Sequence, residues 1–156
     1  MTEKMKILAA QPFLKGMEPR LLELLASDCL PYDFKEDEYI LNEGAPANRF
    51  YLILEGRVEL ESPLPDGDAV HIQTLAAGDL LGWSWLYPPY YWHFDARAVT
   101  PVKALFFYGT HLRELCEENH DLGYELMKRV SEVVIQRLQA ARSEWVEHQK
   151  KVHRAA

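Results

Sequence analysis

Between Tyr39 and Gly82 the chain reads YILNEGAPANRFYLILEGRVELESPLPDGDAVHIQTLAAGDLLG. Short apolar segments alternate in this stretch with turns that contain glycine. The segments with the composition of strands are residues 39–41, 49–54, 57–61 and 70–75. Strands of about five residues with glycine at the corners between them are typical of a β-sandwich or jelly roll. We therefore predict a mainly β fold, a double-stranded β-helix jelly roll with flanking helices.

The flanking segments extend this pattern. Strand composition returns at residues 94–100 and 102–108, and residues 18–28 form an amphipathic pattern with Pro19 in the first helical turn. Two helices are expected at the end of the chain, one capped by Thr110 and reaching about Glu118, the other capped by Asn119 and reaching about residue 150. The expected organisation is a roll with its N-terminal helix at residues 1–118 and a long C-terminal helix with a basic tail at residues 119–156.

Composition limits the class of protein. The chain has 156 residues, 48% of them hydrophobic, which fits one globular domain. It contains no uncharged apolar run long enough to span a membrane and no signal peptide. The two cysteines, Cys29 and Cys116, form no CxxC or Cys/His cluster, so we expect no disulfide framework, no metal site and a reducing, cytoplasmic location.

Charge is unevenly distributed along the chain. Residues 121–156 contain seven Lys and Arg against five Asp and Glu, a net charge of +2. Residues 1–120 contain ten against nineteen, a net charge of −9. A domain this acidic repels phosphate backbones, so direct nucleic-acid binding is not expected.

The last helix carries two apolar stripes. Leu122, Leu126, Val130, Val133 and Arg137 recur at helical spacing and are expected to face the roll. The second stripe has heptad spacing and consists of Met127, Val134, Leu138, Ala141 and Trp145, with Ser131 and Val152. Little chain remains beyond Leu138 to cover Trp145, so we predict that a second copy pairs with this stripe in a homodimer. The alternative is that both stripes pack within one chain.

The order of elements from about Gln11 to Arg142 resembles the cyclic nucleotide-binding domain family of catabolite activators, or Crp/Fnr-like regulators, and of kinase regulatory subunits. The resemblance rests on the segments Tyr39–Gly44 (YILNEG), Phe50–Gly56 (FYLILEG) followed by Arg57, and Ala77–Gly82 (AGDLLG). Each glycine motif alone is weak, but their order is fairly specific for the fold. It implies a phosphate-binding cassette in which backbone amides and a helix end hold a cyclic phosphate, a Glu binds the ribose hydroxyl, and an Arg pairs with the phosphate.

This sequence departs from the family pattern at both polar positions of the cassette. Gly82 is retained, but Trp83 stands at the Glu position and Trp92 at the Arg position. An indole has one N–H donor and no acceptor, so it cannot replace either side chain. Arg97 lies in the following strand and is expected to point outward, because Ala96 and Ala98 point inward. Ordinary binding of cAMP or cGMP is therefore not expected.

Residues 83–94 contain seven aromatic side chains. Two interpretations remain open: Trp83 and Trp92 fill the space of a nucleotide, or they line a remodelled pocket for a flat, apolar or weakly anionic ligand. The candidate ligand-binding residues are Gly82, Trp83, Ser84, Trp92, His93 and Phe94. The imidazolium of His93 could replace the Arg as an anion partner, and nothing in the sequence specifically supports haem ligation by this residue.

Function is predicted as regulatory and not enzymatic. No nucleophile elbow, zinc-protease motif, phosphate loop or cupin His-x-His pair is present. Activators of this family carry a helix-turn-helix domain after the long helix, whereas this sequence ends at Ala156, directly after the predicted helix. We therefore expect either a stand-alone module without its own DNA reader or a truncated relative of these regulators. We expect a sensor domain that signals the state of a small ligand or regulatory protein partner through a dimerising helix. The alternatives are a ligand-free docking module that uses the aromatic loop and a cAMP or cGMP binder with a compensated site.

Overall fold

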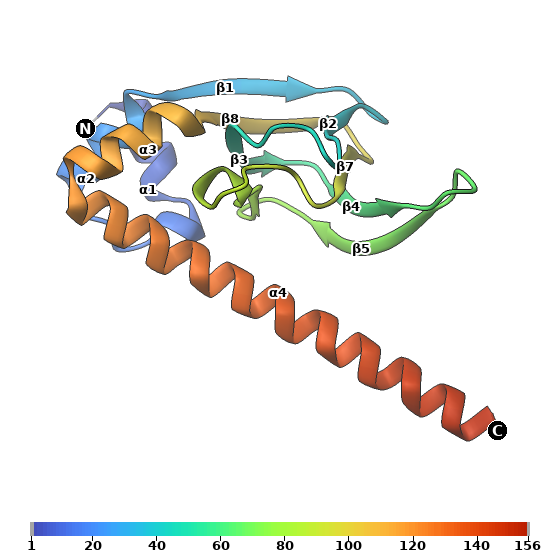
Figure 1. Ribbon diagram of the computed structural model, residues 1–156. Helices are drawn as coiled ribbons and strands as arrows, with labels where there is room; N and C mark the ends of the chain where they lie inside the picture. The colour runs from blue at the N-terminus through green and yellow to red at the C-terminus, as the bar shows by residue number, and fades with distance from the viewer. Residues whose placement is uncertain (1, 156) are drawn as a thin grey trace.

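The computed structural model describes residues 2–155 as a β-roll with helices at one end and a long helix that leaves it (Figure 1). The helices are α1 (Glu3–Ala9), η1 (Pro12–Leu14), α2 (Pro19–Ala26), η2 (Ser84–Leu86), α3 (Gly109–Glu118) and α4 (His120–Ala155). The strands are β1 (Cys29–Phe34), β2 (Tyr39–Leu41), β3 (Arg49–Glu55), β4 (Val58–Pro63), β5 (Ala69–Leu75), β6 (Leu80–Leu81), β7 (Asp95–Ala98) and β8 (Val102–Tyr108).

The strands form two antiparallel four-stranded sheets, which confirms the predicted jelly roll. One sheet has the order β1-β8-β3-β6 and the other β2-β7-β4-β5. Strands that are neighbours in a sheet are mostly distant in sequence: β1 pairs with β8 from Cys29–Phe107 to Phe34–Val102. Consecutive strands therefore alternate between the two sheets, except for β4 and β5, which pair with each other in one sheet.

Strand β3 separates two hydrophobic cores. Phe50 and Leu52 point to one side, where they pack with the helices, while Tyr51 and Ile53 point into the roll. Side chains alternate along a strand, so a strand buried on both faces must be apolar at successive positions. This explains the unbroken run FYLIL in the middle of the sequence. Strand β6 has the same division, with Leu80 in the helical core and Leu81 in the roll core.

The N-terminal helices close the helical core. Leu8 of α1, Phe13 of η1 and Leu21 of α2 pack there with Leu112 of α3. The amphipathic helix expected at residues 18–28 is confirmed as α2, whereas α1, η1 and the two-residue strand β6 are too short to show a clear period in the sequence. The expected cap at Thr110 is wrong, because α3 begins one residue earlier at Gly109 and no side chain caps it.

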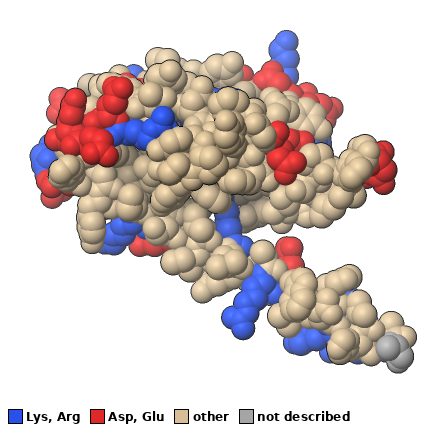
Figure 2. Space-filling model, in the orientation of Figure 1, with Lys and Arg blue, Asp and Glu red and all other residues tan. Residues whose placement is uncertain are grey.

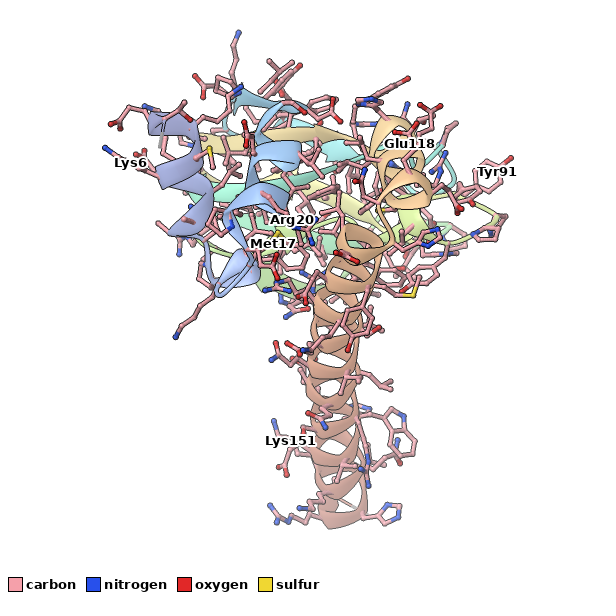
Figure 3. All side chains as sticks on the ribbon, turned by 90° about the vertical axis from the view of Figure 1, so that its left-hand side faces the viewer. Lys6, Met17, Arg20, Tyr91, Glu118 and Lys151 are labelled. Atoms are coloured by element: carbon pink, nitrogen blue, oxygen red, sulfur yellow. The ribbon has the colours of Figure 1, made fainter. Side chains whose placement is uncertain are left out.

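Helix α4 packs on the roll only through its first half. Leu122, Leu126 and Val130 are fully buried, which confirms the predicted roll-facing stripe. Beyond them, Arg137 donates a hydrogen bond to the carbonyl of Leu80. The 18 residues that follow extend about 27 Å away from the roll, as Figure 3 shows from the side, with Lys151 near the far end. No helix within residues 2–155 is long and apolar enough to cross a membrane.

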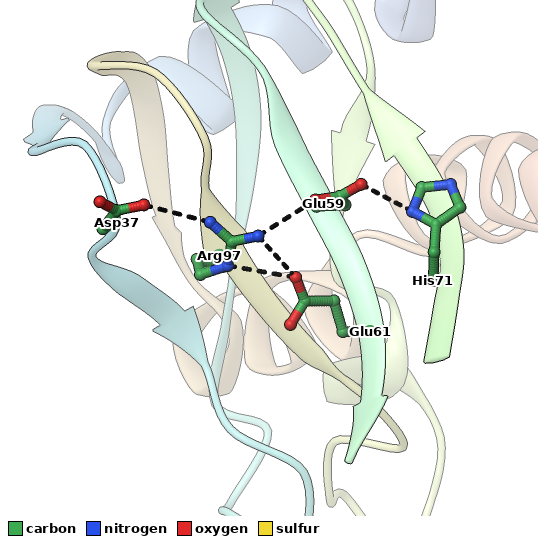
Figure 4. A network of polar contacts seen from close by, with 5 residues as sticks. All are labelled: Asp37, Glu59, Glu61, His71 and Arg97. Atoms are coloured by element: carbon green, nitrogen blue, oxygen red, sulfur yellow. Dashed lines mark hydrogen bonds and ion pairs between the residues drawn. The ribbon is translucent and has the colours of Figure 1, made fainter. Parts of the chain in front are cut away.

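Arg97 lies on the outer face of the roll, as predicted from its neighbours Ala96 and Ala98, which are both buried. Its guanidinium contacts Glu61 at 2.9 Å, Glu59 at 3.1 Å and Asp37 at 3.2 Å (Figure 4). The hydrogen bond to Glu61 is the main reason that the pKa of Arg97 is raised above its ordinary value. This arginine therefore links β7 to β4 and to the turn before β2. Among residues 2–155, no group of three or more His, Cys, Asp and Glu is placed to hold a metal ion.

Cys29 provides a test of the helical core. Its thiol is free and buried beside α1, and burial raises its pKa to about 11 from an ordinary 9.0. At pH 8 about 0.1% of this thiol is ionised in the native chain, against about 10% after unfolding. In a Cys116→Ser background we expect a disulfide reagent to label the native protein at least ~100-fold more slowly than the urea-unfolded protein.

The same shift predicts a pH dependence of stability. Because the thiol ionises at lower pH in the unfolded chain than in the native one, its contribution to stability is complete below pH 9 and is lost as the pH rises toward 11. Cys29→Ala should remove this component of the alkaline loss, measured by urea denaturation at several pH values. For the labelling experiment described above, equal rates in native and unfolded protein would contradict the buried position of the Cys29 thiol.

Candidate ligand site in the roll

The connection from β6 to β7, residues 82–94, occupies the place of the predicted cassette. It begins with Gly82, forms the single turn of η2, and returns along the loop before β3. Three backbone hydrogen bonds fix that return: Gly44 N to Trp92 O at 2.9 Å, Trp92 N to Ala45 O at 3.0 Å, and Ala47 N to Tyr90 O at 2.7 Å. The aromatic loop is thus attached to the roll at the position of Trp92.

The side chain of Trp92 fills the interior of the roll. It is 1% exposed and belongs to the core formed by both sheets. Its neighbours in that core include Tyr51 of β3, Leu81 of β6 and Ala96 of β7. The core also contains Phe94, which follows Trp92 by two residues and points to the same side of the chain. Two of the seven aromatic residues in this segment therefore lie inside the roll.

Gly82 and Trp92 are in direct contact. A Cβ atom at Gly82 would lie 2.9 Å from Cη2 and Cζ3 of the indole, closer than van der Waals contact allows. Gly82 also has a φ of +92°, which L residues rarely adopt. The glycine that the family resemblance assigns to close phosphate approach thus serves in this structure for close approach of an indole.

Trp85 anchors the other side of the segment in the helical core. Its ring stacks on Phe50 with centroids 4.8 Å apart, and Phe50 stacks on Phe107 at 4.5 Å. Arg113 of α3 donates a hydrogen bond to the carbonyl of Trp85 and covers the ring of Tyr90 at 4.2 Å. The segment is therefore held between the roll core and the helical core.

The structure divides the six candidate residues between different surroundings. Gly82, Trp92 and Phe94 are buried together at the roll interior, as described above. Ser84 is buried in η2, and Trp83 is half-buried against the helical core. The side chain of His93 is exposed. The six residues therefore do not line one cavity, and His93 points away from the core that contains Trp92.

Several polar atoms of this segment are buried without a hydrogen-bond partner among residues 2–155: the indole nitrogens of Trp83, Trp85 and Trp92, and the hydroxyl of Ser84. A buried donor without a partner costs about 1–3 kcal/mol. The segment is therefore packed for its apolar contacts at the expense of its hydrogen bonds.

Sequence reasoning missed the roles of Trp85, Gly109 and Arg113. A Cβ at Gly109 would lie 2.9 Å from Cβ of Trp85 and 3.0 Å from the backbone of Asn48, so this glycine makes room for the stack. The signal in the sequence was a glycine at the junction of a strand and a helix, where a capping residue was expected. Arg113 gave no signal, because an arginine on a short helix is usually solvated.

Surface charge follows the distribution expected from the sequence. Figure 2 shows Asp and Glu side chains gathered at the helical end of the domain and at several places on the roll, whereas Lys and Arg are prominent on the part of α4 beyond it. On the face in view, the domain apart from α4 therefore offers little attraction to a multiply charged anion.

Comparison with known proteins identifies relatives. The family model described as "Cyclic nucleotide-binding domain" matches residues 32–119. A curated relative, the CRP-like cAMP-activated global transcriptional regulator of Mycobacterium tuberculosis, is 25% identical over 123 residues, which are 79% of this chain and 55% of that protein. This chain thus spans about half the length of that relative.

Two solved structures show the same architecture. A protein of Geobacter metallireducens GS-15 assigned to the cyclic nucleotide-binding proteins is 30% identical with a TM-score of 0.78, and the match covers 88% of this chain and 99% of that one. The regulatory subunit of a cAMP-independent protein kinase A from Trypanosoma cruzi, bound to guanosine, is 28% identical with a TM-score of 0.64, over 73% of this chain and 40% of that one.

Substitution of Gly82 tests its contact with Trp92. Gly44→Ala is the matched control, because Gly44 has a φ of +83° and a Cβ there would meet nothing within 4 Å. We expect Gly44→Ala to lower the free energy of unfolding by about 1–2 kcal/mol through backbone strain alone. Gly82→Ala should cost a further ~1–3 kcal/mol because it overpacks the indole.

The excess cost of Gly82→Ala should largely disappear in a Trp92→Leu background, where the ring is absent. Urea denaturation measures all four variants. Equal losses for the two glycine substitutions in the wild-type background would show that the contact with Trp92 is unimportant.

Proposed function

This chain belongs to the cyclic nucleotide-binding domain family, and we propose that it acts as a regulatory domain without catalysis of its own. In this proposal α4 carries the output by pairing with α4 of a second copy. The roll interior is closed by Trp92 and does not hold a cyclic nucleotide in the ordinary manner. Two of its relatives support a regulatory role, because one is a transcriptional regulator and the other a kinase regulatory subunit.

The exposed stripe of α4 is the observation that carries the proposal. Leu138 is 67% exposed and Trp145 is 64% exposed on a helix that has already left the roll. Met127 and Val152 are also exposed on this face, Ala141 lies between them, and Val134 is half-buried at the edge of the helical core. Large apolar side chains at heptad spacing on an isolated helix favour a two-stranded coiled coil.

The closed roll supports the proposal that a cyclic nucleotide is not held in the ordinary manner. Trp92 occupies the position that the family resemblance gives to the phosphate-binding arginine, and its ring packs against Gly82. The indole at that position carries no charge that could pair with a phosphate. The Trypanosoma cruzi relative was solved with guanosine, a nucleoside without a phosphate. If the roll opens for a ligand, an uncharged aromatic molecule is therefore the class that fits best.

The docking alternative is supported by one observation. Tyr91 is 48% exposed, and the side chain of His93, two residues further along, is exposed as well. Tyr90 does not join this surface fully, because its ring lies under Arg113. The available aromatic surface is thus smaller than the sequence suggested, and α4 offers more exposed apolar area for a partner.

The oligomeric state tests the output helix. We expect wild-type protein to sediment as a dimer and the Leu138→Glu/Trp145→Glu variant to sediment as a monomer, because two charges would face each other across the seam. Gln139→Glu is the matched control, since Gln139 is exposed on the same turns but outside the stripe. A monomeric wild-type protein, or an unchanged dimer in the double variant, would refute the proposed seam.

Ligand binding tests the closed roll. We expect cAMP and cGMP at about 1 mM to leave the melting temperature of the wild-type protein unchanged. Guanosine is the comparison ligand, and a rise in melting temperature with guanosine alone would identify an uncharged nucleoside as the ligand class. A rise of several degrees with micromolar cAMP would overturn the proposal that Trp92 excludes the cyclic nucleotide.

A further inference from the structure

A cavity lies outside the roll, between the roll and α4. It has a volume of about 270 Å³. Apolar walls come from Phe13, Leu75 and Val133, and polar side chains include Gln73, Gln136 and Arg137. Pockets for small organic molecules have volumes of about 300 Å³ and above, so this cavity suits a ligand at the lower end of that range. We call it the strap cavity, after Arg129 and Arg137, two arginines of α4 that line it.

Two arginines of α4 connect the helix to the roll at the ends of the strap cavity. Arg129 donates to the carbonyl of Lys15 at 2.8 Å and also pairs with Glu125. Arg137 donates to the carbonyl of Leu80. The two residues are eight apart, or about 12 Å along the helix. The cavity therefore lies where α4 separates from the roll.

The guanidinium of Arg137 is incompletely satisfied. Its Nη2 group bonds to Leu80, but Nη1 is buried and has no hydrogen-bond partner within residues 2–155. No carboxylate of the described chain forms an ion pair with it. Burial lowers the pKa of Arg137 to about 10, and only the charge of Asp79 opposes this shift. A buried charge without a partner is strongly unfavourable. A hydrogen bond to the carbonyl of Leu80 alone does not need a charged donor, so it does not explain why an arginine is buried here.

The surroundings indicate which anion would satisfy this charge. Asp79 and Glu132 also line the strap cavity, and Arg129 is already paired with Glu125. A phosphate dianion would therefore meet two carboxylates and a single available guanidinium. A monocarboxylate carries one negative charge, matches the planar fork of an arginine, and leaves an apolar body for the walls of Phe13, Leu75 and Val133.

We propose that the strap cavity binds a small organic monocarboxylate, whose carboxylate pairs with the guanidinium of Arg137. This inference does not rest on the proposed function, because it concerns a site outside the roll and does not require a dimer. The bound ligand would contact Arg137 of α4, and Arg137 in turn bonds to Leu80 of β6.

Titration with sodium benzoate tests the proposal, with inorganic phosphate and sodium chloride at equal ionic strength for comparison. We expect amide resonances of Gly78, Asp79 and Val133 to shift saturably with benzoate in a nitrogen-15 NMR experiment on the full chain. Arg137→Gln should weaken binding at least ~10-fold, since it removes the charged partner. Arg142→Gln removes the same charge from an exposed position of α4 and should leave the affinity unchanged.

Val133→Phe provides a second variant in case Arg137→Gln does not fold. It fills the cavity while the arginine remains, and it should also abolish the shifts. The monomeric Leu138→Glu/Trp145→Glu variant should bind benzoate as wild type does, which separates this test from that of the dimer. Shifts at other residues, equal affinity in Arg137→Gln, or equally tight binding of phosphate would overturn the proposal.

Discussion

The structure depends on the burial of β3 on both faces. Phe50 and Leu52 belong to the core under the helices, and Tyr51 and Ile53 belong to the core of the roll. Because this strand is shared by two cores, the helices cannot move as a rigid layer without disturbing the sheet that supports the roll. Strand β8, its neighbour, has the same division, with Phe107 on the helical side and Ala104 inside the roll. The sheet β1-β8-β3-β6 therefore lies between the two cores and contributes side chains to both.

The aromatic segment between β6 and β7 packs into both of these cores. Trp85 stacks on Phe50 in the helical core, and Trp92 packs against Gly82 in the roll core. In the family that this chain resembles, polar side chains of this connection meet a charged ligand. Here two indole rings provide apolar contacts in both cores, and their N–H groups have no partners within the described chain. The segment is therefore packed as a structural core element.

The sequence was sufficient for the jelly roll and for the inward stripe of α4, because both depend on strong periodicity. Glycine turns marked most strand ends, and Leu122, Leu126 and Val130 are buried as their spacing predicted. Short elements such as α1 and β6 could not be predicted, since they contain too few residues to show a period. The site was less predictable: spacing placed Trp92 at the arginine position of the family motif, but it could not show that this ring packs against Gly82 or that Trp83 packs against the helical core. Arg137 had one signal, a charge at the end of an apolar stripe, whose meaning depended on the fold.

Leu80, Leu81 and Gly82 connect three parts of the protein within a single tripeptide. The carbonyl of Leu80 accepts the hydrogen bond from Arg137, the side chain of Leu81 lies in the roll, and Gly82 contacts the indole of Trp92. Only two planar peptide units separate the residues that make these three contacts. A backbone change that breaks the hydrogen bond from Arg137 therefore occurs directly beside residues packed in the roll core and against the indole. Strand β6 is thus the place where the long helix, the roll core and the aromatic segment meet.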